Sequence, residues 1–127
     1  MEKALILDTN ILIALINGTT PSLPKRAREA LAEHPPHIVS VVSIWEIAIK
    51  FEKGKLALTM PVGEIGAFIQ SLGIDVRPMT LAHAVAVATP LPDTKDPFDR
   101  LLLAVCAVER MKLVTTDQRL EGHWLVY

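Results

Sequence analysis

Short apolar runs and longer amphipathic segments alternate along this chain of 127 residues. The runs lack a helical period, which is typical of buried strands, and they predict strands at residues 3–7, 38–42, 74–77 and 113–115, with a candidate fifth at 124–127. The segments between them predict helices at residues 11–16, 24–33, 43–53, 61–72, 81–89 and 97–111, several bounded by Pro or Gly. Strands that alternate with helices indicate an α/β fold in a single domain, residues 1–127, with a parallel, twisted sheet of four to five strands and helices on both faces.

Composition narrows the class of protein. Half of the residues are apolar and 21% are charged, which excludes a disordered chain. The net charge of −1 does not by itself indicate a nucleic-acid-binding protein, so such a role needs a local patch. The longest apolar run, residues 101–108, is far shorter than a membrane span, and the single cysteine, Cys106, fits a reducing compartment. We therefore expect a cytoplasmic protein without a membrane partner.

Four acidic residues fall at one edge of the predicted sheet. Asp8 follows the first strand, Asp117 follows the fourth, and Glu46 and Asp99 are expected in the first turns of the helices 43–53 and 97–111. The carboxyl ends of parallel strands form the working edge of such a sheet. An unneutralised cluster of carboxylates would be repulsive, and a hard divalent cation, Mg²⁺ or Mn²⁺, would relieve that repulsion. The acids therefore predict a metal site at this edge.

Each acid also has a purely local interpretation. Ser43-Ile-Trp-Glu46 matches a capping box, in which Glu46 only reaches back to the start of its helix. Asp8 and Asp117 could be ordinary helix caps, and Asp99 an acid favoured by the helix dipole. A wider set of polar residues could support the carboxylates or contact phosphate; Asp96 among them is also a strong N-cap candidate. These supporting candidates are Thr9, Asn10, Ser43, Lys50, Asp96 and Thr115.

Four sequence segments together resemble the PIN-domain ribonucleases, and most closely the VapC toxins of bacterial toxin–antitoxin pairs. The segments are Leu7-Asp8-Thr9-Asn10, Ser43-Ile-Trp-Glu46-Ile-Ala-Ile-Lys50, Asp96-Pro-Phe-Asp99-Arg-Leu-Leu-Leu and Val114-Thr-Thr-Asp117. The resemblance covers essentially the whole chain and implies that Asp8, Glu46, Asp99 and Asp117 form the catalytic, metal-binding quartet of that family. It also implies a cognate VapB-type antitoxin and a homodimer. One departure is Thr94, where relatives often carry a histidine shortly before Asp-Pro-Phe-Asp.

The expected activity is metal-dependent endoribonuclease cleavage, with Mg²⁺ (or Mn²⁺) held mainly by Asp8 and Asp99 and activating a water. Lys25, Arg26 and Arg28, and Lys50, Lys53 and Lys55, are candidate contacts to the RNA backbone, although a solvated helix face is the better explanation of the first three. A haloacid-dehalogenase-like phosphatase would need a second Asp where this chain has Asn10. A phosphoacceptor receiver domain would need a paired acid near Asp8 and a late Lys. A non-catalytic PIN-fold module that binds nucleic acid or protein is the remaining alternative.

Overall fold

A computed structural model describes residues 4–33 and 36–127, and its centre is a four-stranded sheet. The strands are β1 (Leu5–Leu7), β2 (His37–Ser40), β3 (Asp75–Arg77) and β4 (Lys112–Val114). Their order is β3-β2-β1-β4 and all neighbours are parallel, which confirms the predicted class of sheet. The predicted start of the first strand at residue 3 lies outside the described residues. The candidate fifth strand is reduced to a single bridge between Leu113 and Val126 in the described part of the chain.

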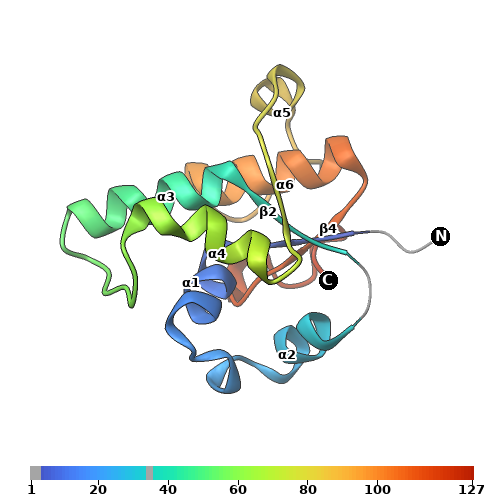
Figure 1. Ribbon diagram of the computed structural model, residues 1–127. Coiled ribbons are helices and arrows are strands. Elements are labelled where there is room, and N and C mark those ends of the chain that lie inside the picture. The colour runs from blue at the N-terminus through green and yellow to red at the C-terminus, as the bar shows by residue number, and fades with distance from the viewer. Residues whose placement is uncertain (1–3, 34–35) are drawn as a thin grey trace.

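Helices connect the strands and cover both faces of the sheet (Figure 1). The α-helices are α1 (Thr9–Asn17), α2 (Lys25–Ala32), α3 (Val41–Glu52), α4 (Ile65–Ser71), α5 (Leu81–Val85) and α6 (Pro97–Glu109). Three short 3₁₀ turns complete the set: η1 (Thr20–Ser22), η2 (Val62–Glu64) and η3 (Gln118–Leu120). None of the helices in the described residues is long and apolar enough to cross a membrane.

The alternation of side chains along the strands separates two hydrophobic cores. Leu5 and Leu7 of β1 point into one core with residues of α1, α2 and α4, while Ile6 points into the other with residues of α6. In Figure 1, α6 accordingly lies on one side of the strands, and α1 and α2 lie on the other. The central strand β1 is buried on both faces, and its sequence is apolar throughout, whereas β3 at the edge of the sheet exposes Asp75 and Arg77. The predicted placement of helices on both faces is confirmed.

Several predicted helix bounds were wrong, and one of them bears on the site. Helix α3 begins at Val41 rather than at Ser43, because the Ser40 hydroxyl accepts the Val42 N–H at 3.1 Å and caps the helix. Glu46 therefore lies in the second turn, and the proposed capping box with Ser43 does not form. The predicted helix over residues 61–72 divides into η2 and α4, and the helix predicted for 81–89 ends at Val85.

The strand order creates a crevice at the carboxyl ends of β1 and β4. The chain runs outward from β1 through β2 to β3, then returns to the other side of β1 to form β4. The Asp8 N–H, directly after β1, donates to the carbonyl of Val114, the last residue of β4, at 2.9 Å, which joins the carboxyl ends of these two strands. In parallel sheets, ligand sites lie at the point where the strand order reverses in this way.

Candidate active site

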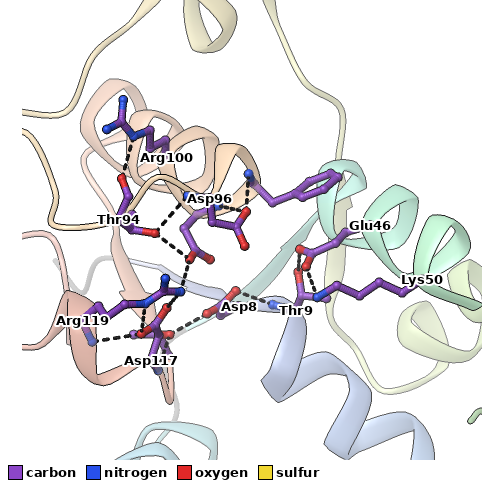
Figure 2. Close-up of polar contacts among 12 residues, drawn as sticks. Asp8, Thr9, Glu46, Lys50, Thr94, Asp96, Arg100, Asp117 and Arg119 are labelled. Atoms are coloured by element: carbon purple, nitrogen blue, oxygen red, sulfur yellow. Dashed lines mark hydrogen bonds and ion pairs between the residues drawn. The ribbon is translucent and has the colours of Figure 1, made fainter. Parts of the chain in front are cut away.

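Asp8 is the central carboxylate of the site. It ends β1 and caps α1: its Oδ1 accepts the Thr9 N–H at 2.6 Å, and its Oδ2 accepts the Thr115 hydroxyl at 2.5 Å. The side chain is buried and points into the crevice, with Glu46 on one side of it and Asp117 on the other (Figure 2). The local interpretation as a helix cap is thus correct, and the same carboxylate also lies among the other acids.

Glu46 reaches the crevice from the second turn of α3, on which it is buried. Its Oε1 accepts the Thr9 hydroxyl at 2.6 Å, and its Oε2 lies 2.5 Å from the Lys50 ammonium one turn further along the helix. The Thr9 hydroxyl also lies 3.1 Å from Ser43 Oγ. Thr9 therefore links Asp8, through its backbone, to Glu46, through its side chain.

The start of α6 contributes Asp96 and Asp99. Asp96 is the N-cap, and its Oδ1 accepts the Phe98 N–H at 2.9 Å, as the cap interpretation predicted. Asp99 lies in the first turn and is buried. Its polar contacts are long: its Oδ2 lies 3.4 Å from the Thr94 hydroxyl and 3.5 Å from the Arg119 guanidinium. Thr94 also accepts the Asp96 N–H at 3.1 Å, so it orients the loop before α6.

Asp117 and Arg119 form the other end of the network. Asp117 follows β4 and caps η3, and its own N–H donates to the Thr115 hydroxyl at 3.0 Å. Arg119 binds both carboxylate oxygens of Asp117, at 3.1 and 2.7 Å. The same guanidinium reaches Asp99, so it lies between two acids that are 18 residues apart in sequence. Thr115 in turn connects Asp117 to Asp8.

The electrostatics show that this cluster is only partly neutralised. Burial, and the charges of Asp8, Asp96 and Asp117, raise the pKa of Asp99 to about 7. Burial also raises the pKa of Asp8, although hydrogen bonds from Thr115 and Thr9 oppose the rise. The Arg119 hydrogen bonds lower the pKa of Asp117. Asp8 and Asp99 are therefore the two carboxylates at which a further positive charge would be most favourable.

At Glu46 the counter-charge is the neighbouring ammonium. Partial burial would lower the pKa of Lys50, but the hydrogen bond and the charge of Glu46 outweigh it and raise the pKa. The Lys50 ammonium therefore stays charged at neutral pH.

This chain is similar to known proteins over most of its length. The family model described as PIN domain matches residues 5–122. The chain belongs to the PIN domain family. Ribonuclease VapC22 of Mycobacterium tuberculosis (strain ATCC 25618 / H37Rv) is 30% identical over 105 residues, which cover 80% of this chain and 78% of the relative. The similarity confirms the VapC-type resemblance that the four motifs predicted.

The donor set of this PIN domain fits an oxygen-preferring divalent ion. Within the described residues, no three acidic, histidine or cysteine side chains are grouped closely enough to enclose a metal. Mg²⁺ does not need such an enclosure, because it keeps several waters and is held by one or two carboxylates. Asp8 and Asp99 offer two buried carboxylates that burial and like charge make receptive to a cation.

Two residues of the PIN domain network were not among the predicted site residues. Arg119 lies two residues beyond Asp117 in a short turn. No sequence pattern predicts that an Arg at this position contacts Asp99. Thr94 had been noted only as a departure from the family, yet its hydroxyl and carbonyl contact Asp99, Asp96 and Arg100. Of the supporting candidates, Asn10 is exposed on α1 and the others lie in the network.

Proposed function

We propose that this chain is a metal-dependent endoribonuclease toxin of the VapC type. The observation that carries the proposal is the connected network of four carboxylates, from four different segments, at the strand-order reversal of a PIN domain. The relative VapC22 is named a ribonuclease, and it matches most of this chain. Asp8, Glu46, Asp99 and Asp117 are the proposed catalytic and metal-binding residues.

In this proposal Asp8 and Asp99 hold Mg²⁺ (or Mn²⁺), while Glu46 and Asp117 complete the site directly or through waters. When bound, such an ion makes an attacking water more acidic and neutralises charge on the scissile phosphate. The protein's own contribution is orientation: Thr9 and Thr115 fix the rotamer of Asp8, and Thr9 and Lys50 fix that of Glu46. The N-terminus of α6 favours the ionised form of Asp99.

The contacts of His123, which lies beside the site, support hydrolysis by water rather than attack by the RNA 2′-hydroxyl. His123 borders a pocket next to Asp117, but its Nε2 lies 2.8 Å from the Pro90 carbonyl and its Nδ1 accepts the Leu125 N–H at 3.2 Å. Both ring nitrogens are thus engaged, and the ring is not available as the acid or base that the 2′-hydroxyl route uses. We expect products with a 5′-phosphate and a 3′-hydroxyl.

The proposed partners are an RNA substrate, a VapB-like antitoxin and a second copy of the chain, in the cytoplasm. Large apolar side chains that stay exposed support the association with other chains, among them Trp45, Leu81, Val85 and Val87. The free, buried Cys106 is consistent with a reducing compartment. A monomer in light scattering at tens of micromolar would contradict the homodimer.

The direct test is cleavage of single-stranded RNA by the purified chain with EDTA, Mg²⁺, Mn²⁺ or Ca²⁺. Cleavage should vanish in EDTA, return with Mg²⁺ or Mn²⁺, and stay weak with Ca²⁺, whose longer and looser coordination orients water poorly. Asp8→Asn should abolish cleavage. Asp75→Asn is the matched control, because Asp75 is an exposed acid at the opposite edge of the sheet.

Two results would contradict this proposal. Cleavage that survives thorough chelation, or a 2′,3′-cyclic phosphate product, excludes the metal-activated water. RNA binding without any cleavage in Mg²⁺ or Mn²⁺ would instead favour the non-catalytic module.

A further inference from the structure

A pocket of about 370 Å³ opens directly beside the candidate active site. Its walls come from the start of α2, from the loop and turn after β4, and from the last residues of the chain. Thr115 and Asp117 belong both to this pocket and to the carboxylate network. An RNA strand whose phosphate lies at the carboxylates would therefore place a neighbouring nucleotide at the mouth of the pocket.

The pocket distinguishes Arg26 from the two other cations of α2. Lys25 forms an exposed pair with Glu29 at 3.8 Å, and the Arg28 Nε donates to the Leu23 carbonyl at 3.0 Å. Arg26 instead lines the pocket, with its guanidinium carbon 5.7 Å from the centre of the Tyr127 ring. A planar cation and an aromatic ring thus lie together at one wall.

The other walls favour a nucleobase over a phosphate group. Glu121 lines the pocket, and its negative charge would repel a phosphate. Gln118 and Thr116 offer an amide and a hydroxyl, which can both donate to and accept from the edge of a base. Unpaired RNA bases are typically bound in this way, stacked on aromatic or guanidinium planes and hydrogen-bonded along one edge.

The ring of Tyr127 is held in place for such a contact. Its hydroxyl donates to Glu33 at 2.5 Å, and its backbone N–H donates to the Leu113 carbonyl at 2.9 Å. A ring that is already oriented loses little freedom when a base stacks against it.

We propose that this pocket receives one unpaired base of the RNA strand, adjacent to the nucleotide that is cut. The base stacks against Arg26 and Tyr127, and its polar edge faces Gln118 and Thr116. The inference rests on the proposed ribonuclease function, because it takes the scissile phosphate to lie at the carboxylates.

The test measures RNA binding in EDTA, by the fluorescence anisotropy of a labelled single strand of about 12 nucleotides. A set of strands lacks the base at one position at a time. For the wild-type chain, one abasic position should weaken binding about fivefold to a hundredfold, the range expected for a lost stacking contact. Arg26→Gln and Tyr127→Leu should weaken binding of the intact strand and should show no further loss at that position.

Matched variants separate the pocket from general effects of charge and folding. Arg28→Gln removes a cation from the same helix but not from the pocket, and it should bind like the wild type. Tyr127→Phe keeps the ring but loses its hydrogen bond to Glu33, so it should bind more tightly than Tyr127→Leu and still weaken at the same abasic position. Thermal unfolding shows whether Tyr127→Leu is folded. If Tyr127→Leu is unstable, the comparison of Arg26→Gln with the wild type still decides the test.

Failure of the pocket and failure of the nuclease function give different results. If the wild type cuts RNA but no abasic position changes its binding, or if Arg26→Gln and Arg28→Gln weaken binding equally, the base pocket is wrong. If the abasic effect is present but no metal supports cleavage, the pocket stands and the nuclease function is wrong. A wild-type chain that binds no RNA overturns both.

Discussion

Replacing Asp99 by Asn should stabilise the metal-free protein. The pKa of Asp99 is raised from 3.8 to about 7, so the folded state holds this proton more firmly than the unfolded chain does. Each unit of pKa corresponds to about 1.4 kcal/mol, so Asp99→Asn can raise the free energy of unfolding by at most about 4 kcal/mol. Solvent at the crevice and the Arg119 guanidinium screen the charge of Asp99. We therefore expect Asp99→Asn to raise the free energy of unfolding by about 2 kcal/mol at pH 8.

The sign of the pH dependence follows from the raised pKa. Protonated Asp99 favours the folded state. Its contribution to the free energy of unfolding is fully present below about pH 4 and is lost as the pH rises through about 7, where the carboxyl group ionises in the folded protein. The advantage of Asp99→Asn should therefore be complete above pH 7 and shrink towards pH 5. Thermal unfolding in EDTA at pH 8 should show a midpoint about 5–8 °C higher than that of the wild type. Asp75→Asn, which changes an exposed acid outside the cluster, should stay within about 0.5 kcal/mol.

Addition of Mg²⁺ completes the experiment. The wild-type midpoint should rise with Mg²⁺ concentration, whereas that of Asp99→Asn should change little and its cleavage should be lost. A lower midpoint for Asp99→Asn in EDTA at pH 8 would show that the four acids are not a repulsive cluster. An equal response of both proteins to Mg²⁺ would remove Asp99 from the proposed metal site.

Three further substitutions test the local physics of the fold. Ser40→Ala should lower the free energy of unfolding by about 1 kcal/mol in urea, because it removes the cap of α3, and Ser40→Asp should retain the cap. Lys50→Met should cost about 3 kcal/mol by leaving the buried Glu46 carboxylate without its cation, and adding Glu46→Gln should recover most of the loss; no recovery would mean that the pair is not the cause. Arg110→Gly should raise stability by about 0.5–1 kcal/mol in calorimetry, because Arg110 ends α6 with a φ of +58°, and an unchanged midpoint would contradict the strain.

The order of strands and helices could be predicted from the sequence because it depends on local patterns. Apolar runs bounded by Pro, Gly or Asp specify buried strands, and their alternation with helices requires parallel pairing. Once the sheet is parallel, Asp8 and Asp117 must lie at the same edge, since both follow a strand. The start of α6 could also be predicted, because Asp96 and Pro97 form a strong local signal for a helix N-terminus.

The start of α3 could not be predicted in the same way. Val41 and Val42 are β-branched and fit a strand as well as a first helical turn, so the pattern extended the strand to Val42 and pointed to Ser43 as the start of the helix. Packing decided the matter: Val42 is buried in the core with α6, and Ser40 was thereby placed at the cap. The shift moved Glu46 by most of a turn and brought it to Thr9.

The polar contacts within the site depend on the tertiary structure alone. Thr9 meets Glu46 across 37 positions of sequence, Thr115 meets Asp8 across 107, and Arg119 bridges Asp99 and Asp117. Likewise, Lys25, Arg26 and Arg28 are similar cations on one short helix, and the position of Tyr127 and the pocket beside α2 set Arg26 apart. Sequence patterns record which face of an element is apolar, whereas the partner of a polar side chain is determined by how distant segments pack. The acids of this site were therefore predictable as a set, and their individual contacts were not.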